Sequence, residues 1–165
     1  MITVKVNGEE RQYPQGATYE DVANDYQKEY DNLIALAARD GKIRELFKKL
    51  TRDCEITFFT LKDNVGNKTY VRSATMLFLK AVFDVYGREA AQNCRVEFAV
   101  GNGSYISPRG QIASTADNAA KIQDRMRELV AAKTPFLKRS YALDNAMELF
   151  HTEGMKDKEK LFRYR

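Results

Sequence analysis

Residues 2–13, Ile-Thr-Val-Lys-Val-Asn-Gly-Glu-Glu-Arg-Gln-Tyr, decide the fold of the first half of the chain. Ile2–Val6 alternates apolar and polar side chains, which is the period of a strand with one buried face. Asn7 and Gly8 follow, and because both accept a positive φ they predict a two-residue hairpin turn. Arg11–Tyr13 is the returning strand. The chain is therefore expected to open with a β-hairpin.

A capped helix is expected after this hairpin. Pro14–Gly16 interrupts the second strand, and the Thr18 hydroxyl can then accept hydrogen bonds from the free amides that begin a helix. Apolar side chains at Val22, Ala23 and Tyr26 share one helical face. The expected elements are a helix at Tyr19–Glu29, a strand at Leu33–Ala38, a turn at Arg39–Lys42 and a strand at Glu55–Leu61. This order suits a small sheet packed on one helix.

Residues 62–68 are polar, contain two turn-forming residues and mark the expected boundary between two domains, 1–62 and 63–165. The second domain is predicted as α+β. Its expected elements are a helix at Val71–Tyr86 ended by Gly87, a strand at Arg95–Val100, a turn at Gly101–Gly103 with a return over Ser104–Ile106, a helix capped by Thr115, a strand at Phe136–Tyr141 and a helix at Leu143–Glu153. Residues 160–165 alternate apolar and basic side chains, so they are expected to begin a strand that continues in a longer protein.

The composition is that of a foldable domain without a membrane span. Hydrophobic residues make up 44% and charged residues 30% of the chain, and the apolar runs are too short to cross a bilayer. The N-terminus has no signal-peptide pattern, so a cytoplasmic location is expected. Residues 63–165 carry 17 Lys/Arg against 12 Asp/Glu, whereas residues 1–62 carry 10 against 11. The positive second half permits contact with phosphates.

The sequence offers no catalytic or metal-binding motif. The glycine-rich stretch Gly101–Gly103 lacks the lysine and hydroxyl that hold nucleotide phosphates in a P-loop. The chain contains one histidine, His151, without a recognisable partner for acid–base chemistry. Cys54 and Cys94 have no metal-ligand spacing and are expected to be reduced thiols. We therefore predict no catalytic residue, metal or cofactor site in this segment.

Both halves of the chain resemble known families. Residues 14–23, Pro-Gln-Gly-Ala-Thr-Tyr-Glu-Asp-Val-Ala, with the Asn7-Gly8 turn before them, resemble a TGS domain, a small ubiquitin-like β-grasp unit. Residues 70–81 resemble the start of the editing-type domain of threonyl-tRNA synthetases, and residues 97–105 its glycine, asparagine and aromatic turn, with 126–129 and 144–150 following in order. The resemblance implies an α+β chain: a β-grasp domain followed by a domain like the second additional domain of threonyl- and alanyl-tRNA synthetases.

The chain departs from the editing domains at one decisive point. Those domains carry two histidines four residues apart on the first long helix, and the matching positions here are Arg72 and Met76. A guanidinium does not act as a base or metal ligand near neutral pH, and a thioether has no proton to transfer. The resemblance therefore implies that hydrolysis of a mischarged aminoacyl-tRNA by the family's route is lost.

A TGS unit followed by an editing-like domain without these histidines resembles the front of bacterial uridine or nucleoside kinases. The resemblance implies a non-catalytic module that binds nucleotide or RNA for regulation, with a kinase domain of the same chain as partner, ATP or GTP with Mg²⁺ in that domain, and a homo-oligomer as a further expectation. The ligand-binding candidates are Arg72, Lys80, Arg88, Arg95, Asn102, Tyr105 and Arg109. The alternatives are the N-terminal region of a divergent threonyl-tRNA synthetase, an assembly domain without a ligand, and an active editing hydrolase, which the missing histidines disfavour.

Overall fold

The computed structural model describes residues 1–101, 103–110 and 112–164, and its contacts divide the chain into two compact units, Met1–Met76 and Leu77–Arg165. The architecture is α+β, as expected from the sequence. The predicted boundary between residues 62 and 63 lies where strand β5 ends and helix α2 begins, so α2 contributes residues to both units. The assignment of two domains stays a prediction, and each unit is described by itself.

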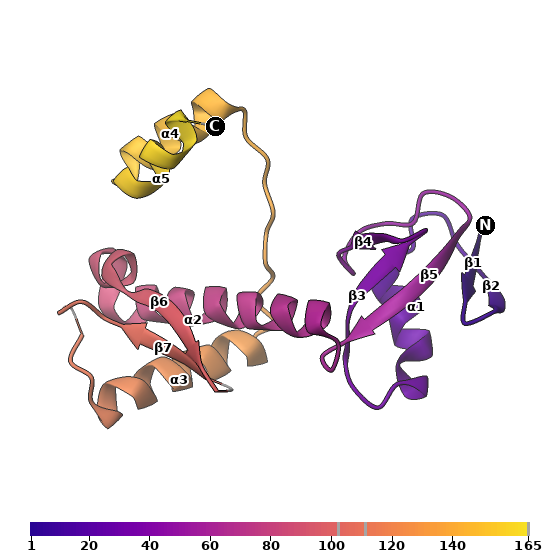
Figure 1. Cartoon of the computed structure of the whole chain (residues 1–165), viewed down its shortest axis with the longest axis horizontal. Coiled ribbons are helices and arrows are strands. Elements are labelled where there is room, and N and C mark those ends of the chain that lie inside the picture. Colours follow the sequence, from indigo (N-terminus) through magenta and orange to yellow (C-terminus); the bar gives the residue numbers. More distant parts are fainter. Residues whose placement is uncertain (102, 111, 165) are drawn as a thin grey trace. The chain divides into compact units, whose positions relative to one another are not determined.

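The first unit is a five-stranded sheet with one helix on its face (Figure 1). Its elements are β1 (Ile2–Val6), β2 (Glu9–Tyr13), α1 (Tyr19–Tyr26), the 3₁₀ turn η1 (Gln27–Glu29), β3 (Ile34–Arg39), β4 (Lys42–Arg44) and β5 (Cys54–Thr60). The strand order is β2-β1-β5-β3-β4. β1 and β5 run parallel, and the other neighbours are antiparallel. The short edge strand β4 follows a turn that the sequence had indicated, but the strand itself was not predicted.

Local chemistry explains the start of this unit. Asn7 and Gly8 have φ values of 51° and 89°, which confirms the predicted hairpin turn. The Thr18 hydroxyl accepts a hydrogen bond from the Asp21 amide, and the Asp21 carboxylate accepts one from the Thr18 amide, forming a capping box. One face of α1 and the inner sheet residues form the core of buried side chains, among them Val4, Tyr19, Val22, Tyr26 and Ile56.

Helix α2 (Asn64–Asn93) begins before the predicted helix, and a second helical stretch follows the predicted end at Gly87. It begins inside the segment expected to be a linker, because the Asp63 carboxylate accepts hydrogen bonds from the amide and hydroxyl of Thr60 and so orders the chain there. The backbone at Gly87 is non-helical, with φ 86° and ψ 179°. Gly87 therefore interrupts the helix as expected, and a further helical stretch continues to Asn93.

The second unit contains the rest of α2, the hairpin of β6 (Arg95–Val100) and β7 (Gly103–Ser107), and the helices α3 (Ala116–Ala131), α4 (Leu143–Thr152) and α5 (Lys156–Arg163) (Figure 1). Thr115 caps α3 as predicted. The core of the second unit is smaller than that of the first unit. Its buried residues are Ala81, Val82, Ala90, Cys94, Ile112, Ile122 and Leu129.

Two strand predictions in this unit are wrong. Phe136–Tyr141 is exposed, and the structure assigns no strand there. The sequence had suggested a strand here, but the segment lies between α3 and α4 without ladder hydrogen bonds to another strand among the described residues. Residues 156–163 form α5, where a strand was expected to begin, because Phe162 packs on Phe150 of α4 with ring centroids 5.3 Å apart. Among the described residues, no helix is both long and apolar enough to cross a membrane.

Candidate functional site

Arg72 and Met76 lie one turn apart on α2, as their spacing requires, and both side chains are exposed. Between them, the Thr75 hydroxyl donates a hydrogen bond to the Val71 carbonyl at 2.9 Å. Neither residue lines the large cavity of the second unit described below. The two positions therefore present a fixed positive charge and a thioether to solvent. Neither side chain can transfer a proton near neutral pH, whatever its surroundings.

The predicted basic residues of the second unit are engaged with carboxylates. Lys80 pairs with Asp84, and Arg88 pairs with Glu153. Arg95 lies 3.8 Å from Asp157, and Arg109 lies 3.7 Å from Glu97. The hydrogen bond from Lys80, with a further one from Arg125, holds the pKa of Asp84 below its usual value. Much of the positive charge expected to meet phosphates is therefore balanced within the unit. Asn102, another predicted ligand-binding residue, lies outside the described residues.

The ring of Tyr105 on β7 stacks on a second aromatic ring, from β6. Val96 pairs with Ile106 and Ala99 pairs with Ser104, so β6 holds one extra residue between these pairs, which is a β-bulge. Because of the bulge, Phe98 stacks on Tyr105, with ring centroids 5.1 Å apart and planes 17° apart. The side chains are 58% and 50% exposed. The sequence indicated Tyr105 but missed Phe98, because strict alternation places Phe98 on the opposite face.

A cavity of about 1180 Å³ opens in the second unit between α2, the β6–β7 hairpin and α3. Its wall is mainly apolar, with Leu77 and Phe78 from α2, Ile106 from β7 and Met126 from α3. Polar groups are few. One is Asn118, whose side chain accepts a hydrogen bond from the Tyr86 hydroxyl and donates one to the Ala113 carbonyl, each at 2.8 Å. The arrangement suits an apolar surface or ligand.

The described residues that line this cavity include no carboxylate and no imidazole. His151 lies on α4, where its Nδ1 is 3.3 Å from Glu159 of α5. The sulfur-bearing Cys94 lies in the wall and is buried, and its burial raises the pKa of its thiol, which disfavours the nucleophilic thiolate. No group of three or more His, Cys, Asp or Glu side chains among the described residues is placed to hold a metal ion. That the segment is non-catalytic stays a prediction, which depends on the properties of His151 and Cys94 and on those of Arg72 and Met76.

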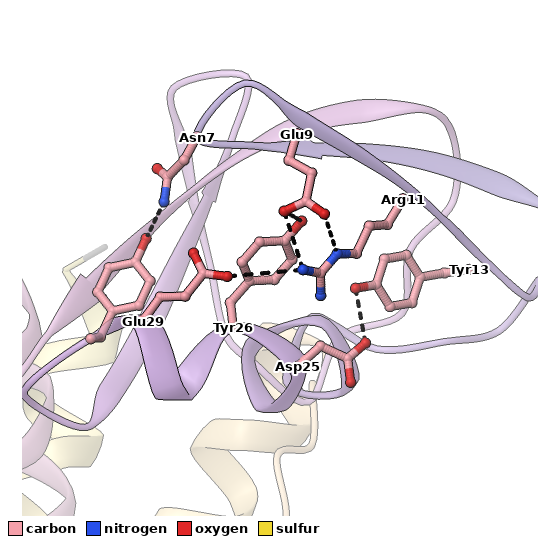
Figure 2. A network of polar contacts seen from close by, with 8 residues as sticks. Asn7, Glu9, Arg11, Tyr13, Asp25, Tyr26 and Glu29 are labelled. Atoms are coloured by element: carbon pink, nitrogen blue, oxygen red, sulfur yellow. Dashed lines mark hydrogen bonds and ion pairs between the residues drawn. The ribbon is translucent and has the colours of Figure 1, made fainter.

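A polar network that the sequence analysis missed joins the β1–β2 hairpin to α1 (Figure 2). Alternate residues of β2, Glu9, Arg11 and Tyr13, point toward the helix. The Arg11 guanidinium donates to both carboxylate oxygens of Glu9 at 2.9 and 3.1 Å, and its Cζ lies 4.2 Å from the ring centroid of Tyr26. Glu29 lies 3.9 Å from the same guanidinium.

Two further hydrogen bonds complete this network. The Tyr13 hydroxyl donates to Asp25 at 3.0 Å, and the Asn7 amide donates to the Tyr30 hydroxyl at 3.2 Å. Burial is the main cause that raises the pKa of Tyr13, and the bond to Asp25 adds to it. Hydrogen bonding to Arg11 lowers the pKa of Glu9. These contacts pair charges internally, so the network holds the hairpin on the helix and offers no free group for catalysis.

No known protein-family profile matches the chain. Its similarity to curated proteins is nevertheless extensive. A threonine–tRNA ligase of Rhizobium etli is 29% identical over 156 residues, which are 94% of this chain and 23% of the ligase. The threonine–tRNA ligase of Hyphomonas neptunium is 26% identical over 162 residues, or 98% of this chain and 24% of the ligase. That of Thermotoga maritima is 26% identical over 164 residues, or 94% of this chain and 24% of the ligase.

The chain thus spans about a quarter of the length of the curated relatives that it matches. Over 94% of its length the chain is similar to a threonine–tRNA ligase.

Proposed function

We propose that the chain is a non-catalytic, tRNA-binding module equivalent to the N-terminal region of a divergent threonyl-tRNA synthetase. The observation that carries the proposal is the continuous similarity to threonine–tRNA ligases over 94% of the chain. The earlier resemblance to the TGS and editing-like domains agrees with it in order and position. The module is proposed to act in the cytoplasm, where tRNA is charged.

The non-catalytic part of the proposal follows from side-chain chemistry. Arg72 and Met76 stand where an editing helix would supply two imidazoles, and neither can take up and release a proton near neutral pH. The cavity between α2, β7 and α3 has an apolar wall, and its described lining supplies no substitute base. Aminoacyl-tRNA bound in this cavity would therefore meet no base among the described residues that line it.

The uridine kinase context is a second proposal, favoured by one observation. The loss of both histidines is the feature by which the sequence resembles the front of such kinases rather than an editing synthetase. In that context the partner is a kinase domain of the same chain, and ATP or GTP with Mg²⁺ binds in that domain, not to residues 1–165. Reading the gene downstream distinguishes the two: a GxxxxGK[ST] motif supports the kinase, and class II synthetase motifs support the ligase.

Two assays of the purified chain test the main proposal. A fluorescein-labelled tRNA for threonine should bind it, as measured by anisotropy at low salt, with an affinity that falls steeply as salt rises. Ser-charged and Thr-charged forms of the same tRNA should lose their amino acid no faster with the protein than in buffer. A chain that binds no tRNA contradicts the module, and turnover in a metal-free preparation contradicts its non-catalytic character.

Met76→His with Arg72→His is the informative variant for the second assay. Placing imidazoles at both positions should leave the fold of the chain intact, since neither change removes a side chain buried in either core. If turnover appears only in the double variant, the chemistry of these two positions is what separates this chain from an editing domain.

A further inference from the structure

Charge in the first unit is strongly segregated along the chain. Residues 1–38 carry 3 Lys/Arg against 7 Asp/Glu, whereas residues 39–52 carry 6 Lys/Arg against 2 Asp/Glu. The net charge of the unit is therefore near zero, although residues 39–52 form a positively charged segment. We call its six cationic residues the basic strip: Arg39, Lys42, Arg44, Lys48, Lys49 and Arg52.

The fold gathers part of the strip at one edge of the sheet. β4 is the edge strand next to β3 (Figure 1), and Arg39 of β3 pairs directly with Lys42 of β4. Lys42 and Arg44 are two residues apart on β4, so their side chains leave the same face as Arg39. Because adjacent strands lie about 5 Å apart, these cations form one continuous positive surface.

The loop that follows β4 is held in place by the start of α1. The amides of Tyr19 and Glu20 donate to the carbonyls of Lys48 and Leu46 at 3.0 and 2.8 Å, and the Leu50 amide donates to the Ala17 carbonyl at 2.7 Å. Leu50 is buried in the core. These bonds satisfy free amides of the helix and give the loop a defined course. Lys48 and Lys49 are therefore carried on ordered backbone.

Several cations of the strip are available to an external anion. Lys48 pairs with Glu45 and Arg52 with Asp40, at 2.8 and 2.9 Å. In the part of the chain that the structure describes, Arg39, Lys42, Arg44 and Lys49 form no ion pair. This contrasts with the second unit, where the predicted cations Lys80, Arg88, Arg95 and Arg109 each face a carboxylate.

An exposed aromatic side chain lies next to Lys48 in this loop. Phe47 is 56% exposed, whereas Ile43 of β4, also exposed, leaves the sheet face opposite to that of Lys42 and Arg44. An exposed aromatic ring next to lysines in the chain offers a face on which a base can stack while the amines contact phosphates. An acidic protein surface would use the charges but would gain nothing specific from the ring.

We infer that the basic strip with Phe47 is the surface of the first unit that contacts RNA, with Lys42 and Lys49 at phosphates and Phe47 against a base. The inference rests on the proposed tRNA-binding function and assigns its site to residues of the first unit other than those that the sequence had indicated. Electrostatic contact with the backbone provides most of the affinity, and stacking adds a contribution that salt does not screen.

Binding of labelled tRNA to the whole chain at several salt concentrations tests the inference. Lys42→Gln with Lys49→Gln should weaken binding about tenfold and reduce the slope of log affinity against log salt by roughly 2. Phe47→Ala should weaken binding roughly tenfold and leave the slope unchanged. The matched control is Lys5→Gln with Lys28→Gln, two exposed lysines of the same unit outside the strip, which should bind like the parent chain.

The outcomes separate this inference from the proposed function. If the parent chain binds tRNA and the Lys42/Lys49 variant binds equally well, or no worse than the Lys5/Lys28 control, the site is elsewhere and the tRNA-binding function stands. If the parent binds no tRNA, both fail. If polyglutamate displaces tRNA from the parent at equal charge concentration and Phe47→Ala has no effect, the strip is a surface for acidic proteins and the RNA assignment is wrong. Circular dichroism confirms that each variant is folded.

Discussion

Arg11 illustrates what a single residue does in the first unit. Its guanidinium meets Glu9 with two donors, lies near Glu29 and stacks over the ring of Tyr26. A surface ion pair by itself contributes little, but the planar guanidinium satisfies the carboxylate and the ring at once. The residue thereby fastens edge strand β2 to α1.

The hydroxyl of Tyr19 gives a prediction at the same scale. The side chain is 1% exposed, and its hydroxyl has no hydrogen-bond partner among the described residues. Because a buried unsatisfied hydroxyl is costly, Tyr19→Phe should raise the free energy of unfolding by about 1 kcal/mol, measured by urea denaturation. Tyr13→Phe is the matched control: it removes a hydroxyl bonded to Asp25 and should lower stability. A loss of stability in Tyr19→Phe would reveal a partner for this hydroxyl.

At the scale of elements, the start of α1 depends on its capping box. Hydrogen bonds from the Thr18 amide and then the Thr18 hydroxyl lower the pKa of Asp21 below the ordinary value of 3.8. A carboxylate with a lowered folded-state pKa contributes its stability above the unfolded pKa and loses it as pH falls through the folded pKa. Asp21→Asn should therefore be less stable than the parent near pH 7, and the difference should shrink below about pH 4.

Thermal melts from pH 7 down to pH 3 check this expectation. Thr18→Ala removes the cap itself and should cost about 1 kcal/mol at neutral pH. Glu20→Gln serves as the control, because Glu20 lies in the same helical turn but outside the capping box. A constant difference between Asp21→Asn and the parent across the whole range would show that the carboxylate charge is irrelevant to the cap.

At the scale of the whole molecule, the segment between α3 and α4 is the weak point. Residues 132–142 are exposed and carry Phe136, Leu137 and Tyr141 without a strand partner. Limited trypsin digestion should cut first after Lys133 or Arg139, and mass spectrometry should find the products of these cuts before any cut within β1–β5. If trypsin cuts neither site, the result would support the strand that the sequence predicted for Phe136–Tyr141. Digestion after heat denaturation controls for intrinsic cleavage rates.

Much of the first unit could be predicted because its signals are local. The Asn7-Gly8 turn, the Thr18 cap and the apolar face of α1 are each decided within a few residues, and all three are confirmed. The second unit was less predictable. A strand was predicted at Phe136–Tyr141, but a strand forms only beside a partner strand, and residue order along the chain does not report which backbone edges are free.

The candidate site shows the same division. The sequence alone determined that positions 72 and 76 carry a guanidinium and a thioether, because this is a property of side-chain identity; that they match two histidines of editing domains stays a prediction. Only the tertiary structure decided which cations are free. Arg88 and Glu153, or Arg95 and Asp157, are far apart in sequence yet paired in space, whereas Lys42 and Lys49 lie without an ion pair among the described residues. The number of charged side chains is known from the sequence. Whether such a side chain is free to bind a ligand depends on contacts between distant residues, which form only when the chain folds.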